Sequence, residues 1–311
     1  MTPPAPASLP TARPPFPVTA PHRVVPAPRP LGDGPHVALD DRWPAAVVRR
    51  LERLATDRSG VVVHDRPVGD GLTAAVRAAW GLLPWPARGS VVPLPLLGLE
   101  VDLDGGAAHR TGPSAVPAAT ERLLTLTGLD LLVEGWLLAC SDDLVVLHRR
   151  GPGLLAAELL AVAFPSGWPV RERGGASLAE LHAPVADGER LQSASPALSE
   201  ALLTKGPFVQ HVWGLDPSGR LDRDPTASDA EPASCPPPAQ WWLRVERQTT
   251  LPLPTLERAL FVISPYLVPL TSLPPEQRGT LRDSVASMSP EALRYKGIEV
   301  VRDDLVDWLA S

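Results

Sequence analysis

Apolar positions recur at helical spacing in several segments of the chain. Val47, Val48, Leu51 and Leu54 follow one another at this spacing after Pro44, while arginine and glutamate occupy the positions between them. Proline is well tolerated in the first turn of a helix, so the pattern predicts an amphipathic helix that begins near Pro44. Similar patterns predict further helices over residues 73–83, 118–127, 177–182, 189–204, 275–287 and 290–295.

Apolar runs bounded by turn residues predict about five strands. Residues 142–148 form one such run, and a Gly-Pro-Gly turn leads from it into residues 154–164 as the second arm of a hairpin, although that arm also suits a helix by composition. Residues 129–140 are a buried helix or strand. Later strands are predicted over residues 208–214, 241–249 and 259–264, the last ended by Pro265. Since these elements do not alternate as repeated βαβ units, we expect an α+β fold with an antiparallel sheet and flanking helices.

Proline marks the parts of the chain that lack periodic patterns. The chain has 39 prolines in 311 residues, and 11 of them fall among the first 30. We therefore expect residues 1–30 to be a disordered Pro-rich tail and residues 222–240 to be a low-complexity loop. Residues 31–128 are predicted to form a helical region that packs on a core of residues 129–311. Within that region, the prolines between residues 84 and 95 leave residues 84–117 without a predicted element.

Charge, hydropathy and cysteine content exclude several classes of protein. With 29 basic and 35 acidic residues, the chain has a formal charge of −6 and no overall positive field to attract nucleic acid. The longest apolar run, residues 154–164, is too short for a membrane span and contains Glu158. Cys140 and Cys235 are too few for a disulfide framework and lack the spacing of a zinc site, which favours a reducing, cytoplasmic location.

Few sequence motifs point to a particular chemistry. Gly151 and Gly153 resemble part of a dinucleotide fingerprint, but a hairpin turn explains both glycines. The seven histidines include no pair at the i, i+3 or i, i+4 spacing of a helical metal site. His182 ends a short predicted helix, where one neutral imidazole could serve as the axial ligand of a haem or could simply cap the helix or pack in the core.

The densest polar cluster lies on the predicted strand 241–249. Strand alternation places Arg244, Glu246 and Gln248 on one face. A guanidinium suits a carboxylate such as a haem propionate, and a glutamate can attract a cationic amine. The alternative is a ladder of ion pairs on a solvated face. Four nearby tryptophans could line an apolar pocket or belong to the core: Trp168, Trp213, Trp241 and Trp242.

Taken together, five motifs resemble those of one protein family, in the same order along the chain. They are Asp143-Leu144-Val145-Val146-Leu147, Phe164-Pro165-Ser166-Gly167-Trp168, Leu181-His182-Ala183-Pro184-Val185, Leu243-Arg244-Val245-Glu246-Arg247-Gln248-Thr249 and Tyr295-Lys296-Gly297. The chain is similar in these motifs to the haem-dependent oxidative N-demethylase family of alpha-subunit-like proteins. The resemblance extends over about residues 130–298.

The resemblance implies a fold with a PAS-like antiparallel sheet that holds haem b. It also implies that the protein catalyses oxygen-dependent N-demethylation of a small secondary amine, with release of formaldehyde. Electrons would come from NADPH through a separate reductase subunit that carries flavin and iron–sulfur cofactors. The resemblance also implies roles for individual residues. His182 would be the axial ligand of the haem iron, and Glu246 would orient the substrate ammonium. The remaining cofactor-binding candidates are Arg244 and Lys296, as propionate contacts, together with Gln248 and Trp168.

The chain departs from the family pattern at several positions near these motifs. Ala186 replaces a proline, Val212 replaces an asparagine, and Ser264-Pro265 replaces an Arg-Thr pair before Tyr266. Such changes leave three alternatives to the amine demethylase: an enzyme with a different substrate, a non-catalytic haem or small-ligand sensor, and a structural subunit without haem.

Overall fold

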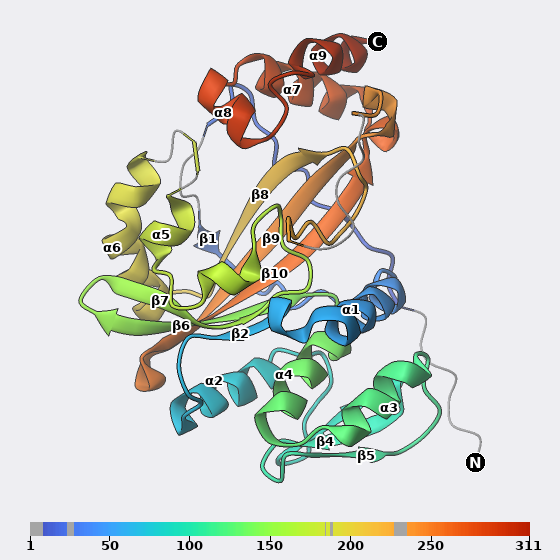
Figure 1. The fold of residues 1–311 in the computed structure, drawn as a ribbon, viewed down its shortest axis with the longest axis vertical. Coiled ribbons are helices and arrows are strands. Elements are labelled where there is room, and N and C mark those ends of the chain that lie inside the picture. The colour runs from blue at the N-terminus through green and yellow to red at the C-terminus, as the bar shows by residue number, and fades with distance from the viewer. Residues whose placement is uncertain (1–8, 24–27, 184, 187–188, 227–234) are drawn as a thin grey trace.

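A seven-stranded antiparallel sheet organises the molecule (Figure 1). The computed structural model describes residues 9–23, 28–183, 185–186, 189–226 and 235–311. The strand order is β1-β8-β9-β10-β6-β7-β2, and every neighbouring pair is antiparallel. The strands are β1 (Arg29–Pro30), β2 (Val62–His64), β6 (Asp143–Gly151), β7 (Leu154–Ala161), β8 (Phe208–Asp216), β9 (Trp242–Leu253) and β10 (Arg258–Pro269).

Helices cover both faces and one end of this sheet, which confirms the α+β class. A second antiparallel sheet of three strands, β3 (Val91–Leu94), β4 (Leu99–Asp102) and β5 (Ala107–Arg110), lies beside them. The helices are α1 (Trp43–Asp57), α2 (Asp70–Trp80), α3 (Pro117–Thr125), α4 (Gly128–Ala139), α5 (Leu178–His182), α6 (Glu189–Thr204), α7 (Pro275–Ala286), α8 (Pro290–Tyr295) and α9 (Arg302–Ala310).

Three apolar clusters hold these layers together. The largest joins α1, α2 and α4 to one face of the sheet through Leu144, Val146 and Leu260. A second cluster joins α7 and α9 to the far end of strands β8, β9 and β10. The third places α5 and α6 on the opposite face, where Ile263 packs in the same cluster as Leu178. The first cluster contains residues from both sides of position 128. The predicted division into residues 31–128 and residues 129–311 stays a prediction.

The strongest periodic patterns correspond to the observed helices. Helix α1 begins with Pro44 in its first turn, as predicted. Helix α4 occupies the segment that the sequence left open as helix or strand, and every residue from Leu131 to Ala139 is buried. A helix buried on all sides has no polar face, so hydrophobic periodicity alone could not distinguish it from a strand.

The predicted count of about five strands is too low. Strands β1 and β2 have two and three residues, too few for an alternating pattern to be detected. The three strands of the small sheet lie in the proline-containing stretch 84–117, for which no element was predicted. There Pro93 sits inside β3, which pairs with β4 only and is an edge strand, where a missing N–H is tolerated.

Strand β10 does not end at Pro265, contrary to the prediction. It continues to Pro269, and Pro265 is the register partner of Glu246 in β9. Pairing with β6 stops at Ile263, so β10 has an open edge from there onward. A proline in an edge strand breaks no ladder on the open side. The side chain of Arg42 covers this edge and donates a hydrogen bond to the carbonyl of Pro265.

Residues 9–23 do not form the solvated tail that their composition predicts. The side chain of Val18 is 6% exposed and packs in the cluster of α7 and α9, with Phe16 beside it. The N–H of Ala12 donates to Asp41 Oδ1 at 2.8 Å, and the N–H of His22 donates to Ser287 Oγ at 2.9 Å. Residues 1–8 and 24–27 of the predicted tail lie outside the described residues, as do residues 227–234 of the predicted loop 222–240.

Among the described helices, none combines the length and the hydropathy that a membrane crossing requires.

Candidate functional site

Three polar side chains of β9 lie in a row on the face of the sheet that carries α5 and α6. Gln248 is the register partner of Ile263, which packs against those helices, and Glu246 and Arg244 follow at alternate positions. Gln248 Nε2 donates to Glu246 Oε2 at 3.2 Å, and Arg244 Nη2 lies 3.5 Å from Glu246 Oε1. The predicted common face of these residues is confirmed.

Glu246 is partly accessible and has apolar neighbours on both adjoining strands. Its side chain is 12% exposed. Val212 of β8 and Pro265 of β10 are its register partners, and the side chain of Val212 is 43% exposed. Cross-strand partners have Cβ atoms about 5 Å apart on the same face. The partly exposed carboxylate therefore lies between two apolar register partners on this face of the sheet.

Tyr295, at the end of α8, is a neighbour of Glu246 that the sequence argument did not select. Burial, together with the negative charge of Glu246, raises the pKa of Tyr295, while Arg173 acts in the opposite direction. The side chain of Tyr295 is 50% exposed, and its hydroxyl is a hydrogen-bond donor within the range of the Glu246 charge. Tyr295 belongs to one of the five motifs, but its distance in sequence from Glu246 concealed this proximity.

Arg244 is buried and bound to main-chain carbonyl groups. Its side chain is 3% exposed. Nη1 donates to the carbonyl of Leu221 at 2.8 Å, and Nη2 donates to the carbonyl of Phe164 at 2.7 Å. These bonds attach β9 to the segments that follow β7 and β8. The geometry suits a structural anchor better than either a propionate contact or a solvated ladder of ion pairs.

His182 ends α5 with its imidazole in one defined tautomer. A capping box, in which Ser177 and Glu180 bond reciprocally, begins this short helix. His182 Nδ1 lies 2.6 Å from the carbonyl oxygen of Leu178. Because a carbonyl only accepts, Nδ1 must carry the proton, and the lone pair of the neutral ring is on Nε2. Burial lowers the pKa of His182, which favours this neutral form.

This state of His182 is the one that a metal-ligating histidine adopts. Such a residue commonly donates its second ring N–H to a backbone carbonyl, which orients the ring and raises the basicity of the ligating nitrogen. The donor set therefore fits a haem iron at Nε2. The same hydrogen bond is also compatible with the capping role left open above, since it satisfies a carbonyl of α5.

Lys296 lies at the edge of the sheet, next to Trp213 of β8. Its Nζ donates to the carbonyl of Trp213 at 2.7 Å and lies 4.6 Å from the centroid of the Trp213 ring. Burial lowers the pKa of Lys296 to about 8, so the ammonium is still mostly protonated at pH 7. Within the described part of the chain, the carbonyl of Trp213 is the one hydrogen-bond acceptor of this ammonium, which has three N–H donors.

The other residues singled out in the sequence are spread over different clusters. Trp168 packs half-buried against the α5–α6 cluster, together with Leu181. Trp213 and Trp241 belong to the cluster of α7 and α9, where Ala186 also packs. Ser264 faces away from Glu246, because its register partner is Arg247. The structure thus brings Glu246 and Gln248 together, with Val212 and Pro265 on either side, and separates them from Ser264.

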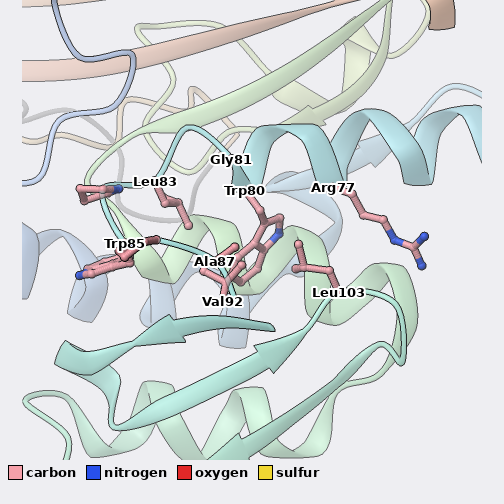
Figure 2. Close-up of a pocket in the computed structure, with 10 residues that line it drawn as sticks. Arg77, Trp80, Gly81, Leu83, Trp85, Ala87, Val92 and Leu103 are labelled. Atoms are coloured by element: carbon pink, nitrogen blue, oxygen red, sulfur yellow. The ribbon is translucent and has the colours of Figure 1, made fainter. Parts of the chain in front are cut away.

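Two cavities lie away from these residues. One, of about 440 Å³, is lined largely by apolar side chains at the end of α2 (Figure 2). Trp80, Leu83 and Trp85 surround it, while the guanidinium of Arg77 extends outward at one end. The other, of about 200 Å³, lies between Arg149 and Leu203. Neither cavity is lined by a site residue predicted from the sequence.

Within the described ranges of the chain, no three histidine, cysteine or carboxylate side chains are grouped so that they could hold a metal ion. A single axial histidine does not require such a group, because a porphyrin supplies the other four nitrogen ligands.

Comparison with protein families gives one match that covers more than half of the chain. The family model described as "Haem-dependent oxidative N-demethylase, alpha subunit-like" matches residues 125–306. This range agrees with the one over which the five motifs show their resemblance. It includes the whole polar row of β9, His182 and Lys296.

Proposed function

Since this chain belongs to the haem-dependent oxidative N-demethylase, alpha-subunit-like family, we propose that it is the haem-binding component of an enzyme that removes a methyl group from a small secondary amine. The observation that carries the proposal is His182, whose neutral Nδ1–H tautomer leaves Nε2 available as an axial ligand. A bound haem b would supply the iron at which dioxygen is activated.

Glu246 is proposed to bind and orient the amine. A secondary amine is a cation at neutral pH, and a carboxylate forms charge-assisted hydrogen bonds with its N–H groups. Val212 and Pro265 flank the carboxylate and give the N-methyl groups apolar surroundings. Tyr295, whose hydroxyl lies within the range of the Glu246 charge, would add a hydrogen-bond donor for the ligand.

Lys296 is the residue we propose for contact with a haem propionate, because its ammonium keeps free donors while Arg244 is bound to backbone carbonyls. Gln248 would position Glu246, and Trp168 would cover the apolar side of the cofactor pocket. The proposal includes a PAS-like arrangement of the sheet, a cytoplasmic location and a separate reductase subunit that delivers electrons from NADPH through flavin and iron–sulfur cofactors.

The first test is an ultraviolet–visible spectrum of protein produced with ample haem supply, recorded oxidised, reduced and with carbon monoxide. We expect one haem per chain and a Soret band that shifts on reduction. His182→Ala should lose or strongly alter this spectrum. His109→Ala, on the exposed surface of β5, is the matched control and should leave it unchanged. A wild-type protein that takes up no haemin, or a folded His182→Ala with an unaltered spectrum, would contradict the assignment.

Turnover then separates the demethylase from a haem sensor. With a competent reductase, a demethylase consumes NADPH and releases formaldehyde only when an N-methylated amine is present. A sensor would bind haem and gas ligands without amine-dependent turnover. Glu246→Gln should weaken amine binding far more than haem binding, because it removes the negative charge and leaves the fold of β9 in place.

A further inference from the structure

A chain of amide and carboxylate groups crosses from β8 to β9 and ends at Glu246. Gln210 and Gln248 are register partners, and Gln210 Nε2 donates to Gln248 Oε1 at 2.8 Å. Gln248 Nε2 in turn donates to Glu246 Oε2 at 3.2 Å. Gln210 lies just beyond the short pairing between β1 and β8, and it is not among the residues selected from the sequence.

The chemistry of Glu246 determines the direction of this chain. An ionised carboxylate only accepts hydrogen bonds, so the NH₂ group of Gln248 must face Glu246. The carbonyl oxygen of Gln248 then faces Gln210, which must donate. Because Gln210 holds the Gln248 amide in this orientation, it fixes the direction of a carboxylate that it does not touch.

We propose that Gln210 is a positioning residue, which acts through the Gln248 amide to keep the Glu246 carboxylate fixed in direction for a cationic amine. The inference rests on the proposed role of Glu246. It adds a residue on a different strand and a mechanism that can be tested without turnover. If the Gln248 amide were free to turn, its carbonyl oxygen could face the carboxylate, and two acceptors would repel each other.

Gln210→Met removes the donor with little change in side-chain length and no change in charge. The NMR signal of the Glu246 carboxyl carbon at pH 7, observed in protein labelled with carbon-13 glutamate, should shift and broaden, because the carboxylate loses a donor that is held in one orientation. Binding of dimethylammonium at pH 7, measured by calorimetry, should weaken by about threefold, which corresponds to about 0.7 kcal/mol. Gln277→Met, at a half-buried position of α7, should change neither value and serves as the control.

Gln210→Glu is a second, independent variant, in which the side chain at position 210 accepts a hydrogen bond from Gln248 instead of donating one. A carboxylate at position 210 accepts from the NH₂ group of Gln248, so the carbonyl oxygen of Gln248 turns toward Glu246. Dimethylammonium binding should weaken further than in Gln210→Met although a negative charge has been added, and the loss should persist in about 0.5 M NaCl, where a direct charge effect is screened. A purely structural role for Gln210 would lower the melting temperature of both variants and leave the Glu246 carboxyl signal of the folded protein unchanged.

These measurements separate the relay from the proposed function. A changed Glu246 carboxyl signal in both variants supports the relay even in a protein that binds no dimethylammonium, and that protein would refute the amine-binding role alone. If the folded Gln210→Met and Gln210→Glu proteins both keep the wild-type carboxyl signal, or if the Gln277→Met control changes it equally, the relay is refuted. Dimethylammonium binding by wild type and both variants with equal affinity would refute the positioning role while leaving Glu246 as the amine site.

Discussion

Substitution of Val18 tests whether residues 9–23 are part of the folded core or the solvated tail that their proline content suggests. Val18 is 6% exposed among the side chains of α7 and α9. Val18→Ala removes two buried carbon atoms, each worth about 0.8 kcal/mol of transfer free energy, so the free energy of unfolding should fall by about 1.6 kcal/mol. The cavity left behind adds to this loss only if the segment cannot relax into it.

Chemical denaturation of the wild type and two variants provides the measurement. The control is Val48→Ala, the same change at a position of α1 that is 45% exposed, which should stay within about 0.5 kcal/mol of the wild type. Removal of residues 1–23 should likewise lower the melting temperature, because Leu9, Phe16 and Val18 pack against the apolar clusters. A Val18→Ala protein as stable as the wild type would show that the segment is solvated and that composition predicted it correctly.

Three further predictions concern stability. Arg50→Met should lower the free energy of unfolding by about 3–5 kcal/mol in denaturation, because Asp143 and Arg50 form an ion pair with both side chains 0% exposed, and the carboxylate would be left buried without its partner. Burial raises the pKa of Asp142 to about 6, above its unfolded value of 3.8. Protonation of Asp142 therefore contributes its full stabilisation of the folded state below pH 3.8, and this contribution is lost as the pH rises through 6. Asp142→Asn should therefore stabilise the protein at pH 8, by at most about 3 kcal/mol, and have no stabilising effect at pH 3.5; equal effects at both values would contradict the burial argument. Glu257 follows a short 3-10 turn and has a left-handed φ of 52°, and Gly98 follows an equivalent turn between β3 and β4 with a φ of 59°. Glu257→Gly should therefore raise the melting temperature by relieving about 1 kcal/mol of backbone strain, whereas Gly98→Ala should lower the melting temperature.

The sequence allowed the long elements to be predicted and concealed those that depend on distant partners. Helix α1 and the β6–β7 hairpin carry their own periodicity and turn residues, so local patterns suffice. Strand β1 exists because two residues meet the edge of β8, and no pattern of two residues can indicate that. Likewise, Val18 and Phe16 are isolated apolar residues among prolines. Their burial depends on a cluster built from residues more than 190 positions later in the chain, beginning with Leu215.

Residues of the candidate site show the same limit. Alternation along β9 correctly placed Arg244, Glu246 and Gln248 on one face. It could not show that the carbonyl of Phe164, 80 residues earlier, accepts a hydrogen bond from the guanidinium of Arg244. It also could not identify Gln210, because a cross-strand partner is known only when the register of β8 against β9 is known.

The different environments of Arg244 and Glu246 explain how one strand can be both an anchor and a binding surface. The buried guanidinium of Arg244 donates to three main-chain carbonyls, those of Arg220, Leu221 and Phe164, and has little freedom to move toward Glu246. The two side chains lie 3.5 Å apart. A close bidentate pair would have compensated the charge of Glu246 and occupied one acceptor site on each carboxylate oxygen. With Arg244 held by the main chain and Gln248 donating to Oε2, Glu246 keeps acceptor sites for a ligand between its register partners Val212 and Pro265. Strand β9 is thus attached to the core at Arg244, and its acidic residue, Glu246, follows two residues later. A cationic ligand can bind Glu246 there without competing for the contacts that stabilise the sheet.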